Sequence, residues 1–198
     1  MTMEEFIVRC NALIAEQLEG ISWTLLLLMM TAVFLLVHVA VLIWSRLRGE
    51  EMRPGKEILL MLLAGYACFL FQITFYNREE GSRSGIFTHI SMWLKSGSPD
   101  LSNQMIYDLL NVCLFVPWGA LIALFRGREK IGRKLFLTTC YSFLTSFCIE
   151  VIQLLTHRGY FELMDILTNV TGGILGGLAT VILYVIVPAQ GKTRSNHG

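Results

Sequence analysis

Long apolar segments separated by short polar connectors make up most of the chain. Each apolar segment has about 20 residues, which is enough for a helix to cross the hydrocarbon core of a bilayer. The five predicted spans are Ser22–Trp44, Ile58–Tyr76, Met105–Phe125, Leu135–Leu155 and Asp165–Val187. The pattern therefore predicts an all-α fold, a polytopic transmembrane helix bundle.

The segments outside the spans differ in their patterns. Apolar and charged residues alternate within residues 3–20, which predicts an amphipathic helix on the membrane surface. The longest loop, 77–104, carries an amphipathic patch at 86–94 that would lie in the headgroup region or close as a lid over a site. The chain divides into an N-terminal segment (1–21), the first span with a basic connector (22–57), a transmembrane domain (58–187) and a polar tail (188–198).

Composition excludes an ordinary soluble protein. Hydrophobic residues make up 54% of the chain and charged residues 16%, whereas soluble domains carry roughly 25% charge. The net charge of +1 points to no nucleic acid or other acidic partner. The five cysteines show no CxxC spacing, so we interpret them as small apolar side chains rather than as a disulfide framework.

The distribution of basic residues predicts how the chain crosses the membrane. Lys and Arg number 11 in the connectors 45–57 and 126–134 and the tail after 187, against 5 on the other side. Because cytoplasmic loops are enriched in these residues, we predict a multi-pass protein of the cell membrane with its N-terminus outside and its C-terminus in the cytoplasm.

Polar residues inside the spans converge at the outer face in this topology. They form pairs at i,i+3 or i,i+4 spacing, so each pair lies on one side of its helix. The pairs are Asp108 with Asn111, Glu150 with Gln153, and Asp165 with Asn169, and Arg158 lies in the loop between the last two. We predict that these residues form one outward-facing polar pocket, because ionisable groups within a membrane are costly without partners.

Three uses of this pocket fit the residue types. Arg158 suits an anionic group such as a lipid phosphate, and the N-termini of the third and fifth spans add positive dipole ends. The carboxylates of Glu150 and Asp165 also suit acid–base catalysis, or a divalent cation held with Asn oxygens. Buried hydrogen bonds that only tie the helices together are the structural alternative. We predict binding, with no metal and no cofactor.

Small residues in the third and fifth spans predict close helix packing. Gly172 with Gly176, and Gly173 with Gly177, form two overlapping GxxxG pairs. Such pairs allow helix backbones to approach closely, either within the bundle or in a homodimer. Pro117 and Gly119 interrupt the third span, where proline removes one backbone hydrogen bond.

Two sequence blocks resemble the VanZ-like family of bacterial membrane proteins. Residues 111–119, NVCLFVPWG, are similar to the family's Asn-x-x-x-Phe-x-Pro-x-Gly segment. The second block runs from Glu150 to Gly176 and is similar to the family's Glu-x-x-Gln, Arg and Asp-x-x-x-Asn-x-x-Gly pattern. Many relatives carry an acidic pair where this chain has Met164 and Asp165, so only Asp165 corresponds.

The resemblance implies a role in resistance to teicoplanin-type glycopeptide antibiotics. The expected partners are membrane lipids, with a cell-wall precursor or the antibiotic itself as further ligands. An enzyme that modifies an envelope lipid or a lipid-linked cell-wall precursor is the alternative function. A small-solute or proton-coupled transporter is less favoured, since few polar groups besides His38 lie toward the cytoplasmic side.

Overall fold

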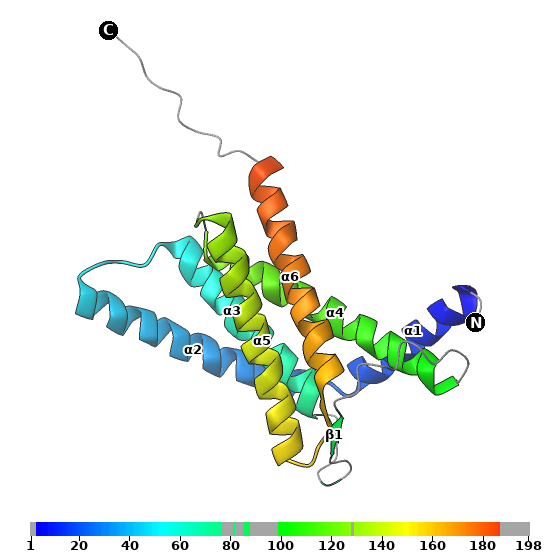
Figure 1. Cartoon of the computed structure of the whole chain (residues 1–198). Helices are drawn as coiled ribbons and strands as arrows, with labels where there is room; N and C mark the ends of the chain where they lie inside the picture. Colours follow the sequence, from blue (N-terminus) through cyan, green and yellow to red (C-terminus); the bar gives the residue numbers. More distant parts are fainter. Residues whose placement is uncertain (1–2, 77–80, 82–84, 88–98, 128, 187–198) are drawn as a thin grey trace.

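The computed structural model describes residues 3–76, 81, 85–87, 99–127 and 129–186. The helices and strands follow one another along the chain as Figure 1 shows. They are α1 (Met3–Glu19), α2 (Trp23–Arg48), α3 (Pro54–Phe71), the π-helical turn η1 (Gln72–Tyr76), β1 (Ile86–Phe87), α4 (Pro99–Phe125), α5 (Ile131–Leu155), β2 (Phe161–Glu162) and α6 (Leu163–Ile186). The predicted tail at 188–198 and the 88–94 part of the amphipathic patch lie outside the described residues.

Among the described residues, five helices are long and apolar enough to cross a membrane, which confirms the predicted fold class. The helices extend beyond several predicted spans into the polar connectors, because local signals set their ends. Ser22 caps α2 by accepting the Leu25 backbone N–H at 3.4 Å. Gly49 ends α2 at a left-handed φ of 66°, and Pro54 begins α3.

α4 and α6 form the most extensive helix contact in the bundle. A Cβ added at Gly172 would overlap the Val112 carbonyl oxygen, and one at Gly176 would overlap the Val116 carbonyl oxygen. These contacts advance in the same direction along both helices, so α4 and α6 run parallel. Backbones meet directly across this contact, which glycine permits and any larger residue prevents.

The other glycine pair of α6 lies against α5. Gly173 is next to Ser142, and Gly177 is next to Thr138. Here the order reverses, so α5 and α6 are antiparallel, as the short turn between them requires. The two GxxxG pairs of α6 therefore contact two different helices of the same chain.

An apolar core joins α3, α4 and α5. Phe115, Leu70, Phe75 and Ile149 are buried together. Around them, the Tyr66 hydroxyl donates to the Leu114 carbonyl at 2.6 Å. α4 continues through Pro117, whose side chain is exposed, and ends at Phe125.

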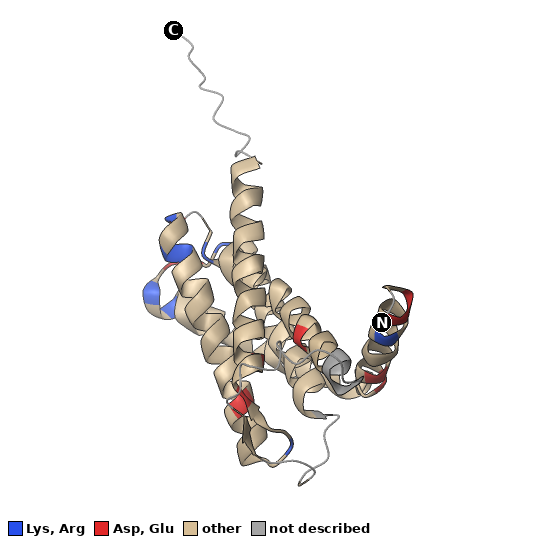
Figure 2. Cartoon of the chain, turned by 45° about the vertical axis from the view of Figure 1, so that its right-hand side comes forward, with Lys and Arg blue, Asp and Glu red and all other residues tan. Residues whose placement is uncertain are grey.

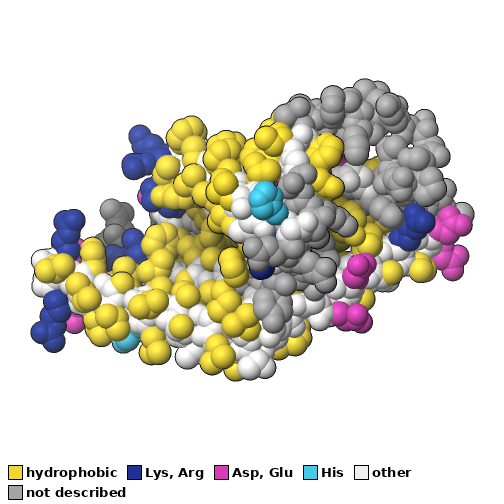
Figure 3. Space-filling model, turned by 90° about the horizontal axis from the view of Figure 1, so that it is seen from below, with side chains coloured by type: hydrophobic (Ala, Val, Ile, Leu, Met, Phe, Trp, Pro, Cys, Tyr) yellow, Lys and Arg dark blue, Asp and Glu magenta, His cyan; other side chains and the backbone are white. Residues whose placement is uncertain are grey.

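α1 and α2 lie outside this core. Within α2 only Leu26 and Val41 are buried, and α1 has no buried residue. Figure 3 shows hydrophobic side chains spread over the described surface, with charged side chains toward its margins. Lipid is the natural environment for such a surface, and the location of α1 at the membrane surface stays a prediction.

Candidate functional site

Two short strands bring together two loops that are far apart in the sequence, at one end of the bundle. β1 pairs in parallel with β2, with Ile86 opposite Phe161 and Phe87 opposite Glu162. The Phe161 N–H also donates to the Gly85 carbonyl at 2.9 Å. We call this the strand end. It includes the end of α5, η1 and the beginning of α6 (Figure 1). The described part of the long loop therefore lies directly beside the turn that carries Arg158.

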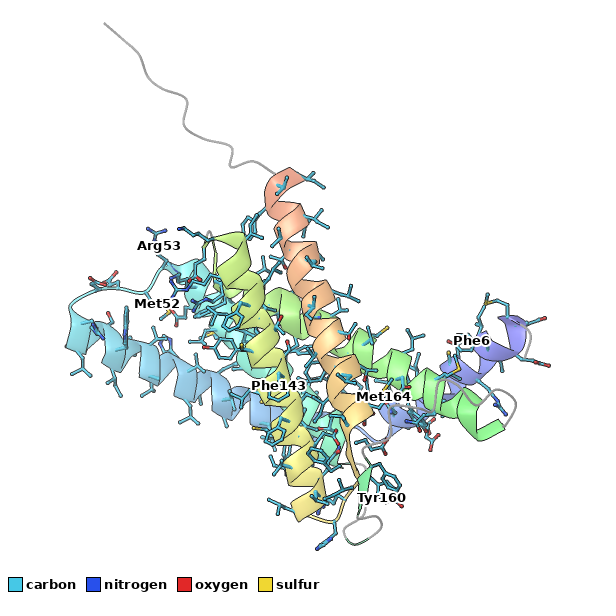
Figure 4. All side chains as sticks on the ribbon, in the orientation of Figure 1. Phe6, Met52, Arg53, Phe143, Tyr160 and Met164 are labelled. Carbon is cyan, nitrogen blue, oxygen red and sulfur yellow. The ribbon has the colours of Figure 1, made fainter. Side chains whose placement is uncertain are left out.

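Basic residues gather at the opposite end, which we call the basic end. Figure 2 shows them where α2 ends and where α3 and α5 begin. The described members are Arg46, Arg48, Arg53, Lys56, Arg126, Lys130, Arg133 and Lys134. The side-chain view separates the ends in the same way, with Arg53 and Met52 far from Tyr160 and Met164 (Figure 4).

Glu150 is a buried carboxylate that holds the strand pair against α5. Its side chain is 1% exposed, and its Oε2 accepts the backbone N–H of Glu162 at 2.8 Å. A hydrogen bond to an ionised acceptor is stronger than a neutral one. Glu150 therefore fixes β2, and with it the first turn of α6, relative to the end of α5.

Gln153 connects the same helix to a different neighbour. Its Nε2 donates to the Thr74 carbonyl at 3.2 Å, which belongs to the π-helical turn after α3. Backbone carbonyls at a helix end lack intrahelical donors, so a side chain can bond them. Glu150 bonds to the backbone of β2 and Gln153 to that of η1, so these two residues, one helical turn apart, connect the end of α5 to two different neighbours.

The turn after α5 positions Arg158. His157 has a left-handed φ of 54°, the Arg158 N–H donates to the Gln153 carbonyl at 3.0 Å, and the His157 N–H donates to the Leu154 carbonyl at 3.2 Å. This pair of bonds is the Schellman motif that ends many helices. Arg158 and Asp165 are both half-buried here, and both have interaction partners.

Asn169 and Asp108 lie deeper between the helices. The Asn169 Nδ2 donates to the Ser146 Oγ at 2.9 Å, and both side chains are buried. The Gln104 side chain hydrogen-bonds the Asp108 carboxylate, and the charge of Glu162 acts on it. Asp108 Oδ1 and Asn169 Oδ1 are buried without a hydrogen-bond partner among the described residues.

The helix register places Asp108 and Asn169 at similar depth. Val112 meets Gly172, so Asp108, one turn earlier, lies at the level of Thr168. Asn111 is half-buried on α4, one turn before the buried Phe115. We use the name polar cluster for the buried or half-buried polar residues of the strand end. They are Asp108, Ser146, Glu150, Gln153, Arg158, Glu162, Asp165 and Asn169.

A family model described as VanZ/LLP1 matches residues 21–184. The chain belongs to the VanZ/LLP1 family. The match is wider than the 58–187 segment that carries the sequence motifs, because it begins at Ile21 and takes in the first span. No curated protein and no solved structure matches the chain.

Some residues of the cluster in this VanZ/LLP1 protein were missed by the sequence reasoning. Glu162 contributes both its backbone N–H and its charge, and Ser146 accepts from Asn169. Glu162 lies between Arg158 and Asp165 in the sequence, but the hydrogen bond from its backbone N–H to Glu150 depends on the chain reversal after α5. Within the described residues, no group of three His, Cys, Asp or Glu side chains is placed to hold a metal.

A row of buried polar residues also runs along α5 of this VanZ/LLP1 chain. It occupies every fourth position, namely Lys134, Thr138, Ser142, Ser146 and Glu150. The spacing keeps the row on one helix face, against the glycines of α6. At its basic end, the Lys134 Nζ lies 4.2 Å from the centre of the Tyr184 ring. The expectation of few polar groups beyond His38 toward this end is therefore wrong.

His38 itself pairs with another residue. Its Nδ1 lies 2.8 Å from Glu57 Oε1, which joins the middle of α2 to the first turn of α3. The contact is at the basic end and remote from the polar cluster. It gives His38 a structural role in positioning α2.

Proposed function

We propose that this VanZ/LLP1 protein lowers sensitivity to lipophilic glycopeptide antibiotics of the teicoplanin type by binding an anionic envelope component at the polar cluster. In this proposal the strand end faces outward and the basic end faces the cytoplasm. The charge asymmetry between the two ends supports that orientation, because cytoplasmic connections are enriched in Lys and Arg.

The observation that carries the proposal is the convergence of buried polar side chains from α4, α5 and α6 at the strand end. Asp108, Glu150 and Asn169 are each at most 5% exposed. Burying such groups in a membrane bundle costs free energy, and here each of three helices buries one at the same end. Hydrogen bonds that hold the chain together account for the burial of Glu150 and Gln153. Asp108 Oδ1 and Asn169 Oδ1, however, have no donor among the described residues.

The anionic group would bind at Arg158. Arg158 lies on the turn between α5 and α6 and is half-buried. A guanidinium matches the geometry of phosphate and carboxylate oxygens. α6 begins directly after β2 at this end, so the positive end of its helix dipole also favours an anion there.

Antibiotic sensitivity tests this proposal. The wild type, Arg158→Ala and Glu150→Ala would be expressed at matched membrane levels in a susceptible Gram-positive host. We expect the wild type to raise the inhibitory concentration of teicoplanin more than that of vancomycin, and both variants to lose the protection. Glu51→Gln, which changes an exposed carboxylate outside the cluster, should protect like the wild type.

Glu150→Gln separates a folding role from a binding role. Glutamine keeps an oxygen that can accept the Glu162 N–H, so the strand pair should stay in place. If the glutamine and alanine variants both fold and protect as well as the wild type, the cluster has no part in resistance.

An enzyme acting on an envelope lipid or lipid-linked precursor is the second candidate. The observation in its favour is that Glu150 and Asp165 bring carboxyl groups from α5 and α6 to the strand end, since two carboxylates from different elements suit paired acid and base roles. Expressing cells would then show a changed lipid or precursor profile that Asp165→Asn abolishes. An identical profile in cells with and without the protein would exclude this candidate.

A further inference from the structure

We propose that the polar cluster accepts a primary ammonium group, which binds between α4 and α6 at Asp108 and Asn169. This inference rests on the proposed function and deepens it by naming the ligand class. An envelope amphiphile that presents a phosphate to Arg158 and an ammonium to Asp108 is zwitterionic. The expected ligand is therefore a lipid headgroup of the aminophosphate type.

Two buried oxygens of the polar cluster lack donors, and this is the first reason for the assignment. Asp108 is 4% exposed and Asn169 is 5% exposed. Their Oδ1 atoms have no hydrogen-bond partner in the part of the chain that the structure describes. Leaving a buried acceptor unsatisfied costs about 1–3 kcal/mol, and more if the group is charged. A bound donor removes that cost.

The other atoms of these two side chains are already engaged, so the vacant atoms are specific. The Asn169 Nδ2 donates to Ser146 at 2.9 Å, and its Oδ1 is the atom of this amide that has no partner among the described residues. Gln104 hydrogen-bonds the Asp108 carboxylate. Both remaining positions are acceptors, so they match a ligand that donates hydrogen bonds rather than one that accepts them.

The charge of the surroundings selects a cationic donor. Asp108, Glu150, Glu162 and Asp165 contribute four carboxyl groups from α4, α5, β2 and α6, against the single guanidinium of Arg158 in the described part of this end. A neutral hydroxyl would satisfy the hydrogen bonds, but an ammonium also forms a charge-assisted hydrogen bond with the Asp108 carboxylate. A primary ammonium has three donors, whereas a trimethylated one has none.

The α4–α6 contact limits how deep the ligand reaches. Directly beyond this level, Gly172 lies against the Val112 carbonyl, with no room for even a methyl group. The headgroup would therefore stop at Asp108 and Asn169. Exposed apolar side chains such as Met105, Leu109 and Leu167 line the same level of α4 and α6 and suit the acyl chains of a lipid.

A lipid-retention measurement tests the inference. The full chain would be purified from nanodiscs containing equal amounts of phosphatidylethanolamine and phosphatidylcholine with identical acyl chains, and retained lipid would be identified by native mass spectrometry. Only the ethanolamine headgroup donates hydrogen bonds. We expect about tenfold enrichment of phosphatidylethanolamine, the ratio given by one charge-assisted hydrogen bond.

Asp108→Asn removes the charge at nearly constant shape, and the enrichment should fall to about the equal ratio of the input. The matched control Glu51→Gln should retain the wild-type enrichment. Equal retention of both lipids by the wild type would overturn the inference without any variant, and so would undiminished enrichment in a folded Asp108→Asn protein.

A competition experiment distinguishes a membrane lipid from a soluble ligand that carries the same headgroup. Displacement of the lipid by millimolar phosphoethanolamine would show that the headgroup alone binds, and no displacement would show that the acyl chains are needed. Both results keep the ammonium site. Teicoplanin protection without ethanolamine enrichment would refute this inference alone, whereas enrichment without protection would refute the proposed function alone.

Discussion

At the residue scale, the backbone turn at His157 has an unusual conformation for its residue type. Its φ of 54° lies in the left-handed region, at the position of a Schellman motif that glycine usually occupies. A side chain with a Cβ is strained there, and the motif orients the neighbouring Arg158.

His157→Gly is expected to stabilise the protein by about 0.5–1 kcal/mol, because glycine adopts left-handed φ at no steric cost. The measurement is the midpoint of thermal unfolding in detergent micelles. Thr156→Gly is the control, because Thr156 has a right-handed conformation at φ −88° and gains nothing from glycine. A lower midpoint for His157→Gly than for the wild type would contradict the strain argument.

The sequence predicted the polar residues of the site better than their contacts. The positions of Glu150, Gln153 and Asn169 follow from ionisable or amide groups inside apolar segments. Their partners are a backbone N–H of Glu162, a backbone carbonyl of Thr74 and the hydroxyl of Ser146. Backbone groups and serines are present throughout any sequence, so nothing in the pattern marks these particular ones.

At the scale of helices, α6 is the element on which the bundle depends, because its two glycine pairs contact α4 and α5. The two contacts differ in what faces the glycine. A Cβ added at Gly176 would meet the backbone of Val116 and Ala120, whereas one added at Gly177 would lie 3.2 and 3.3 Å from side-chain atoms of Thr138 and Leu135.

Gly176→Ala is therefore expected to destabilise the bundle by about 1–3 kcal/mol. The added methyl group would overlap backbone atoms of α4, which can make room only if the helix itself shifts. Gly177→Ala makes the same chemical change one residue away and should cost much less, because flexible side chains can shift. Unfolding in SDS titrations of the purified protein measures both. Equal destabilisation by the two substitutions would show that the α4–α6 contact is looser than the structure indicates.

Helix spans were the most predictable feature of this chain, since length and apolar composition alone decide them. Helix ends were less predictable. α2 continues into the basic connector as far as Gly49, and α3 already begins within that connector at Pro54. The polar row of α5 escaped prediction for a different reason. Its Ser and Thr residues are tolerated on any face of a membrane helix, so only the glycines of α6 reveal which face is buried.

At the scale of the whole molecule, the two ends differ in charge, and this difference predicts orientation. Single cysteines introduced at His157 and Glu51, in a background without native cysteines, would mark the strand end and the basic end. A membrane-impermeant thiol reagent added to intact cells should label His157→Cys and spare Glu51→Cys, which should react only after the membrane is opened. The reverse pattern would place the polar cluster in the cytoplasm and contradict the proposed function.

The polar row of α5 bears on how the chain enters the membrane. α5 has the lowest mean hydropathy of the five candidate spans, and alone it would expose Lys134, Ser142 and Glu150 to lipid. α6 covers the middle of this row, because Gly173 lies against Ser142 and Gly177 against Thr138.

During synthesis, then, α5 would wait at the insertion machinery until α6 emerges, and the two would enter the bilayer as a hairpin. A chain ending after Tyr160 should leave α5 poorly inserted and quickly degraded, while the chain ending after Ile186 should be stable, as pulse-chase labelling would show. Equal lifetimes would mean that α5 inserts alone. Membrane insertion of α5 would in that way depend on a helix that is synthesised after it.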